Sequence, residues 1–179
     1  MKQAAMINRA NGALIGVALG DALGMPTQTL SRAEIAKAYG PIRGFVAPYP
    51  DHPVSHGLHA AQITDDTEQT LLLAEQVIQG QGLVDATAWA QSLLDWETDV
   101  KRRGSRDLLG PSSKAAIDAL MAGVPADKTG QTGTTNGAAM RIVPVGIATA
   151  PDLDQILCRV VAACQVTHAT GEAIAAAAA

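Results

Sequence analysis

Aromatic side chains are scarce in this sequence. Phe, Trp and Tyr make up 3% of the 179 residues, although hydrophobic residues make up 47%. Most of that hydrophobic share comes from Ala, Leu, Val and Ile. β-Sandwiches and barrels use more aromatic and β-branched residues, whereas small apolar side chains let helices pack closely. The composition therefore favours an all-α fold.

Basic clusters, cysteines and long apolar runs are also rare. The largest basic cluster is Lys101-Arg102-Arg103 and the net charge is −4, so no nucleic-acid partner is expected. Cys158 and Cys164 lie on different faces of a predicted helix, which predicts two reduced thiols in a cytoplasmic protein. No apolar run is long enough to cross a membrane, so no membrane partner is expected.

Helix signals occur along the whole chain and strand patterns do not. Capping residues precede apolar stretches, as in Ser31-x-x-Glu34, and a long irregular stretch from Pro41 to Ile63 interrupts them. The length suits a single domain over residues 1–179. Helices are predicted over about residues 4–23, 31–40, 64–80, 85–98, 112–123, from 152 past 164, and from 170 to the end. Pro144 is expected to interrupt a short apolar segment after Gly137. The residues expected to begin these helices are Thr64 or Asp65, Asp85, Ser112 or Ser113, Asp152 and Thr170.

The two ends of the chain carry further signals. Gly12, Gly16 and Gly20 recur every four residues in the first predicted helix, which predicts a groove that another helix approaches closely. The chain stops at Ala179 within its last predicted helix, without a capping residue. We therefore expect the polypeptide to continue beyond the residues shown.

The segment Thr64-Asp65-Asp66-Thr67 places two carboxylates between two hydroxyls at a predicted helix start. All four side chains offer oxygen, the ligand atom that Mg²⁺, Mn²⁺ and Ca²⁺ prefer. Because the first residue is not yet helical, both carboxylates can converge on one point. Thr and Asp are also good N-caps, and acids favour this end of the helix dipole. Helix capping alone and metal binding are therefore both open.

A glycine- and threonine-rich segment runs from Gly130 to Gly137 and is followed by Ala138-Ala139-Met140-Arg141. Glycines let backbone N–H groups approach an anion closely, and the next helix start adds its dipole. The spacing is not that of a P-loop. Arg141 either pairs with a phosphate or bonds backbone carbonyls of the fold.

Acidic and histidine side chains mark three other places. Asp21 closes the first predicted helix at the unfavourable end of its dipole, so it either organises backbone amides or belongs to the site. His168 precedes a helix start, where it contacts a ligand or serves the fold. The loop histidines have no zinc spacing and are expected to be solvated or to line a substrate site: they are His52, His56 and His59.

These motifs occur together in an order that resembles the ADP-ribosylglycohydrolase family. The resemblance spans essentially the whole chain. It rests on Gly20-Asp21-Ala22-Leu23-Gly24, Thr64-Asp65-Asp66-Thr67, Asn136-Gly137-Ala138-Ala139-Met140-Arg141, and Thr167-His168 with Glu172-Ala173.

The resemblance implies a compact orthogonal bundle of helices with a site for two divalent cations, Mg²⁺ or Mn²⁺. Thr64, Asp65 and Asp66 match the first metal-ligand segment. The stretch from Asn136 to Arg141, with Gly137 and Met140, matches the lining of the ADP-ribose or phosphate pocket, and His168 matches a residue near the substrate. The implied reaction is hydrolysis at the anomeric carbon of a ribose, with Asp65 or Asp66 handling protons.

Two features depart from the family pattern. The second ligand segment, of Asp-x-Asp-Thr type, has no counterpart here, so the fold is expected to be truncated on its C-terminal side. We expect either a C-terminal fragment of the same protein as a partner or an inactive product. Gln28 stands where members that act on ADP-ribosylated proteins commonly carry Glu, and an amide is neither a base nor an anionic ligand.

The sequence thus predicts a metal-dependent hydrolase of N-glycosidic bonds in an ADP-ribosyl group or a related ribosyl compound, with Gln28 among the substrate contacts. One alternative is a nucleoside-type N-ribohydrolase of the same family. Another is a non-catalytic protein that binds ADP-ribose or a nucleotide.

Overall fold

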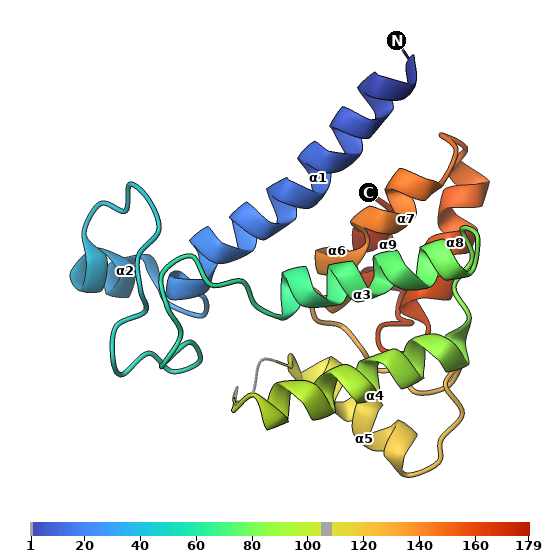
Figure 1. Ribbon diagram of the computed structural model, residues 1–179. Coiled ribbons are helices and arrows are strands. Elements are labelled where there is room, and N and C mark those ends of the chain that lie inside the picture. Colours follow the sequence, from blue (N-terminus) through green and yellow to red (C-terminus); the bar gives the residue numbers. More distant parts are fainter. Residues whose placement is uncertain (1, 105–108) are drawn as a thin grey trace. The chain divides into compact units, whose positions relative to one another are not determined.

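A computed structural model describes residues 2–104 and 109–179, and in this part of the chain it contains helices and turns but no strand (Figure 1). The all-α prediction is confirmed.

Two compact units are present, Met1–Thr67 and Glu68–Ala179, and the boundary between them falls within one helix. The prediction of a single domain over residues 1–179 stays a prediction. The elements are α1 (Lys2–Gly24), a 3₁₀ turn η1 (Met25–Thr27), α2 (Arg32–Tyr39), α3 (Asp65–Gln79), α4 (Ala86–Arg102), α5 (Pro111–Met121), α6 (Gly137–Arg141), α7 (Val143–Ala148), α8 (Leu153–Cys164) and α9 (Gly171–Ala178).

The predicted capping box opens helix α2. The Ser31 hydroxyl accepts from the Glu34 N–H at 3.3 Å, and the Glu34 carboxylate accepts from the Ser31 N–H at 2.7 Å. The helix ends at Gly40, whose φ of +61° suits glycine. The long irregular stretch follows as predicted, and the Tyr39 hydroxyl ties its start to η1 by donating to the Pro26 carbonyl at 2.7 Å.

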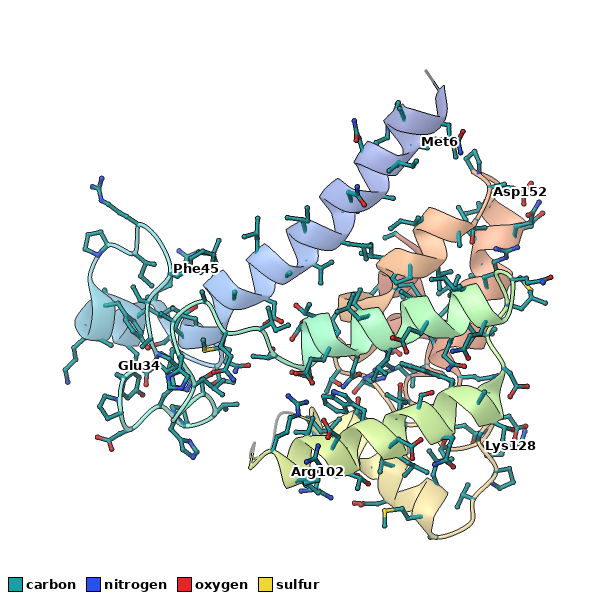
Figure 2. The ribbon with its side chains drawn as sticks, viewed as in Figure 1. Met6, Glu34, Phe45, Arg102, Lys128 and Asp152 are labelled. Atoms are coloured by element: carbon teal, nitrogen blue, oxygen red, sulfur yellow. The ribbon has the colours of Figure 1, made fainter. Side chains whose placement is uncertain are left out.

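Helix α1 is apolar on most of its surface and yet largely exposed. Met6, labelled on α1 in Figure 2, is 66% exposed. Ile7, Ile15, Leu19 and Leu23 are exposed as well. Apart from the neighbouring residues and backbone of α1 itself, no atom of residues 2–67 lies within 4 Å of a Cβ built at any of the three glycines in the predicted groove. The close approach of another helix is therefore not found within the first unit.

The core of the second unit forms where apolar residues recur one helical turn apart. Leu73 and Val77 do so on α3, and Trp89 and Leu93 on α4, and all four are buried. Burying one such side chain fully contributes about 1.5–3 kcal/mol. Helix α9 packs against α6 and α8, and α4 packs against α5 and α8.

Two helix starts differ from the prediction. Pro111 opens α5 one residue before the expected serines, since proline lacks only an N–H that has no partner in a first turn. For the same reason Pro144 lies at the start of α7, where an interruption was expected. Both cysteines are free, as predicted. None of the helices in residues 2–104 and 109–179 is long and apolar enough to cross a membrane.

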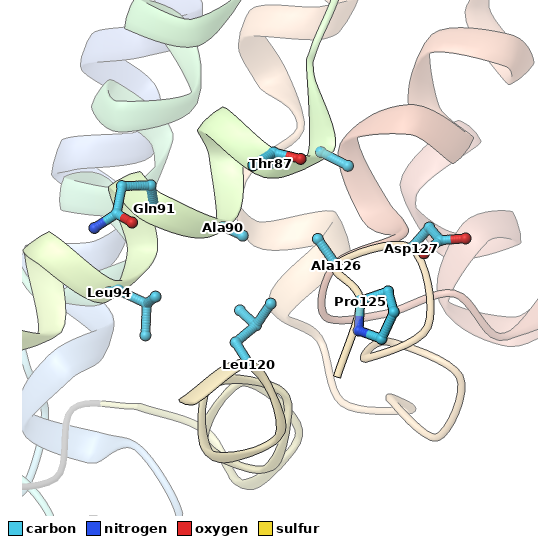
Figure 3. A pocket seen from close by; sticks show the side chains of 9 residues that line it. Thr87, Ala90, Gln91, Leu94, Leu120, Pro125, Ala126 and Asp127 are labelled. Carbon is cyan, nitrogen blue, oxygen red and sulfur yellow. The ribbon is translucent and has the colours of Figure 1, made fainter. Parts of the chain in front are cut away.

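A hollow opens beside α4 in the second unit (Figure 3). None of the predicted site residues lines it. Its lining consists of Ala86, Thr87, Ala90, Gln91, Leu94, Leu120, Pro125, Ala126 and Asp127.

Candidate active site

The acidic segment lies at the start of helix α3. The helix begins at Asp65, Thr64 is buried, and Asp65 and Asp66 are half-buried. Asp21, near the end of α1, accepts from the N–H of Thr64 at 2.7 Å and from the N–H of Thr67 at 3.2 Å, so its carboxylate serves N–H groups of the first turn of α3. Of the two roles expected for Asp21, the structure supports that of organising backbone amides.

Three carboxylates influence one another at this helix start. Burial raises the pKa of Asp65 to about 7, with further contributions from Asp66 and then Asp21. Burial and the charge of Asp21 also raise the pKa of Asp66. The Thr64 hydroxyl lies between two of these groups, 2.7 Å from Asp21 Oδ1 and 3.4 Å from Asp66 Oδ2. A positive charge at this place would be stabilised by all three carboxylates.

The chemistry of these donors suits a hard divalent cation, because all of them are oxygens. Among residues 2–104 and 109–179, however, no three His, Cys, Asp or Glu side chains converge closely enough to hold a metal ion. Thr64, Asp65 and Asp66 therefore fit as part of a ligand set. Further oxygen ligands from water, substrate or polypeptide would be needed to complete six-fold coordination.

Gln28 belongs to the first unit and has a partner there. Its amide nitrogen donates to the Ser55 hydroxyl at 2.7 Å, and that hydroxyl donates to the Met25 carbonyl at 2.8 Å. Ser55 is buried and Gln28 is half-buried. The side chain is thus oriented by the irregular segment that follows α2.

His52 differs from the expectation of a solvated loop histidine. It is only 1% exposed, and its Nδ1 accepts from the N–H groups of Val54 at 3.1 Å and Ser55 at 2.8 Å. Burial lowers its pKa, with a smaller contribution from His56. His52 therefore shapes the turn that holds Ser55, because each buried N–H needs an acceptor. His56 and His59 are exposed, as expected.

Arg141 is the centre of a buried polar network in the second unit. It is 1% exposed, donates to Gln69 Oε1 on α3 and to the Thr167 hydroxyl, and lies 5.4 Å from the centre of the Trp89 ring. His168 continues the network, with Nδ1 2.8 Å from the Thr167 hydroxyl and Nε2 2.9 Å from the Thr135 hydroxyl. Burial and the nearby Arg141 lower the pKa of His168 to about 4, so the imidazole is neutral at pH 7.

The glycines of the glycine-rich segment face the turn that carries His168. A Cβ at Gly130 would lie 2.4 Å from the Gln165 carbonyl oxygen, and one at Gly133 would lie 2.0 Å from that of Thr167. A Cβ at Gly137 would lie 2.5 Å from the His168 ring. These glycines therefore serve a close contact between two segments of the chain, whereas the sequence suggested a contact with an anion.

The remaining predicted contacts lie on or beside α6. Asn136 is exposed, Gly137 is buried and Met140 is half-buried, with its carbonyl accepting from the Thr70 hydroxyl at 3.4 Å. The second unit thus brings Gly137, Arg141 and His168 together, and the first unit brings Asp21 to the acidic segment. Gln69 was not predicted. It lies four positions after Asp65, on the same face of α3, which is the signal that could have found it.

Comparison with known proteins agrees with these motifs. A family model described as ADP-ribosylglycohydrolase matches residues 2–179. The chain is 35% identical to the uncharacterized protein YegU of Escherichia coli K12 over 92% of its own length and 49% of that protein. It is 31% identical to the ADP-ribosyl-[dinitrogen reductase] glycohydrolase of Rhodospirillum rubrum, over 90% of this chain and 51% of that one.

A third relative is the ADP-ribosylarginine hydrolase Tri1 of Pseudomonas putida GB-1, 28% identical over 94% of this chain and 43% of that one. The chain spans about half the length of these curated relatives. Because the family model covers nearly every residue and the motif segments form the networks described above, the chain belongs to the ADP-ribosylglycohydrolase family.

Proposed function

We propose that this chain supplies the first metal-ligand segment and part of the substrate pocket of a hydrolase that cleaves the N-glycosidic bond of an ADP-ribosyl group. The observation that carries this proposal is the adjacent pair of half-buried carboxylates, Asp65 and Asp66, at the start of α3 in a chain of this family. Two of the relatives are named as hydrolases of ADP-ribosylated compounds. Both names support the substrate class.

Thr64, Asp65 and Asp66 are the residues that would hold Mg²⁺ or Mn²⁺. When bound, such cations supply Lewis acidity at the ribose hydroxyls and at the attacking water. In the hydrolysis, water forms the new bond to the anomeric carbon and the C–N bond breaks, with its electron pair leaving on the nitrogen. Asp65 or Asp66 accepts the proton of the water and returns it to the departing nitrogen.

We propose Asn136, Gly137, Met140, Arg141 and His168 as the substrate side of the site. Asn136 is the exposed member and would contact the ligand directly. Arg141 and His168 are buried and bonded to neighbouring side chains, so their described contacts support an indirect role in holding α6 and the glycine-rich segment. A direct contact of Arg141 with a phosphate stays a prediction.

The test measures the release of ADP-ribose from ADP-ribosylarginine with Mn²⁺, with Mg²⁺ and with a chelator. Activity should require the cation and should fall below detection in Asp65→Asn and Asp66→Asn. Asp127→Asn, at an exposed carboxylate beside the hollow of Figure 3, is the matched control and should retain activity. Full activity in both variants would disprove the assignment. Binding of ADP-ribose without turnover, unaffected by chelator, would favour the non-catalytic alternative.

Gln28 supports a second candidate, an N-ribohydrolase of nucleosides or other small ribosyl compounds. Its amide is held by Ser55 and cannot replace a carboxylate as base or anionic ligand. On this proposal a panel of nucleosides is hydrolysed faster than ADP-ribosylarginine, and Gln28→Glu shifts the preference towards ADP-ribosylarginine. Equal preference in wild type and variant would count against this role of Gln28.

We also propose that a polypeptide corresponding to the unmatched half of the relatives associates with this chain. The observation behind this proposal is that the chain covers only 49% and 51% of two of its relatives. Denaturing mass spectrometry of the purified protein would detect such a fragment. If the chain is alone, we expect weak cation binding and no hydrolysis.

A further inference from the structure

The carboxylate of Asp21 accepts four hydrogen bonds from two threonines. Oδ2 accepts from the Thr64 N–H at 2.7 Å, the Thr67 N–H at 3.2 Å and the Thr67 hydroxyl at 2.6 Å. Oδ1 accepts from the Thr64 hydroxyl at 2.7 Å. A carboxylate offers about four lone-pair sites, and four donors from the protein engage it here, three of them at Oδ2. Both oxygens of Asp21 are thus committed to holding the two threonines.

The two threonines flank the two predicted cation ligands. Thr64 directly precedes Asp65, and Thr67 directly follows Asp66. Each threonine is fixed by both its backbone N–H and its hydroxyl, so the peptide on either side of the acidic pair has a defined orientation. Successive side chains on a helix point about 100° apart, so a rotation of this turn would redirect both carboxylates.

We propose that Asp21 is a positioning residue that fixes the first turn of α3 and thereby aims Asp65 and Asp66 at the cations, without binding a cation itself. This inference rests on the proposed function of Asp65 and Asp66.

A carboxylate at position 21 has an electrostatic cost that a neutral cap would avoid. It adds a third negative charge near Asp65 and Asp66, and like charges at this distance repel. An asparagine has only one acceptor oxygen, and its NH₂ group would face the N–H and hydroxyl donors of the threonines. Only a carboxylate accepts all four bonds, which explains why an acid stands at the unfavourable end of α1.

The first experiment measures amide hydrogen exchange in Asp21→Asn in the presence of a chelator. Exchange of the Thr64 and Thr67 amides should accelerate by about tenfold, because each loses a charge-assisted bond. If Asp21 is instead a cation ligand, removing it from the cation-free protein relieves repulsion. Exchange at both amides would then stay the same or become slower, which would overturn the proposal.

Two further variants keep the result interpretable. Asp152→Asn is the matched control, since Asp152 caps α8 by accepting from the Gln155 N–H at 2.9 Å and asparagine caps equally well. Exchange at Gln155 should not change.

Thr67→Val removes only the hydroxyl donor and serves if Asp21→Asn does not fold. The amide at position 67 should then exchange faster than in the wild type, but by a smaller factor than in Asp21→Asn. Unchanged exchange at this amide would contradict the proposal.

The second experiment is a Mn²⁺ titration followed by electron paramagnetic resonance. We expect Asp21→Asn to weaken Mn²⁺ binding about 10–100-fold, as is typical when a group that orients metal ligands is removed. Unchanged affinity together with faster exchange would overturn the positioning role and leave Asp21 a purely structural cap. If the wild-type protein binds no Mn²⁺, the proposed function fails for this chain, and the exchange data decide separately whether Asp21 fixes the turn.

Discussion

The start of helix α3 gathers negative charges close together, whereas the surroundings of Arg141 hold a single positive charge among neutral hydrogen-bond partners. At the start of α3, Asp65 and Asp66 remain half-buried, and burial together with the negative charge of Asp21 raises the pKa of both carboxyl groups. Around Arg141, a buried cation donates to Gln69 and Thr167, and the neighbouring His168 is kept neutral. Accumulated charge that solvent still reaches can attract a counter-ion, whereas a charge whose hydrogen bonds join parts of the fold contributes to stability.

The largest expected effect comes from removing the buried cation. Arg141→Met leaves Gln69 Oε1 without this donor in the core, which should cost about 3–5 kcal/mol of unfolding free energy. Urea denaturation followed by circular dichroism measures the change. Arg102→Met removes an arginine that pairs with Asp99 at the surface and should cause no measurable change. Equal stability of the wild type and Arg141→Met would mean that the network contributes nothing.

The next effect is a pH dependence. The pKa of His168 is about 4 in the folded protein and near 6.5 in an unfolded chain, so the unfolded state binds more protons between these values. The contribution of neutral His168 to the free energy of unfolding should therefore be complete above pH 6.5. It should be lost as the pH drops towards 4, by at most roughly 3 kcal/mol.

His168→Gln should remove this part of the pH dependence, and His59→Gln, at an exposed histidine, should retain it. Urea midpoints measured at several pH values would provide the comparison. The same slope in wild type and His168→Gln would show that His168 is not kept neutral by the fold.

A smaller effect tests the close contact of the glycine-rich segment. A Cβ at Gly133 would overlap the Thr167 carbonyl, so Gly133→Ala should destabilise the protein by about 1–3 kcal/mol. Gly146→Ala is the matched control, because no atom outside its own stretch of α7 lies within 4 Å of a Cβ there and alanine favours the helix by about 1 kcal/mol. Thermal unfolding should shift in opposite directions for the two variants, and a shift in the same direction would contradict this contact.

The smallest expected effect has the opposite sign. In cation-free buffer at pH 8, Asp65→Asn removes a repelled, half-buried charge and should stabilise the protein on the order of 1 kcal/mol. A shift from 3.8 to about 7 would correspond to roughly 4 kcal/mol without solvent screening, so the smaller figure includes that screening. The same variant should lose Mn²⁺ binding. Destabilisation by Asp65→Asn would show that the carboxylate serves the fold.

Much of the helical framework could be predicted from local signals. The Ser31 and Glu34 capping box, the Asp85 and Asp152 caps and the Thr170 cap all lie where the sequence placed them, because a cap acts within one turn of its own helix. The exceptions were Pro111 and Pro144, where proline opens a helix. Local reasoning could not decide whether each of these prolines begins a helix or interrupts one, because proline is tolerated in a first turn and also ends helices.

The sequence by itself determined which residues could carry the chemistry. The adjacent carboxylates of Asp65 and Asp66, the glycine-rich segment and His168 were recognisable by residue type and order. It also determined the helical class, since helix formation depends on local propensity and periodicity. These properties need no contact between distant segments.

Only the tertiary structure decided what caps α3, what the glycines face and how Arg141 is used. Asp21 lies 43 positions before Thr64, Gly133 faces Thr167, and Gln69 meets Arg141 across 72 positions. Each of these contacts joins segments that no periodicity relates. A hydrogen bond or a steric overlap depends on distances of a few ångströms, and these are set by the packing of the helices.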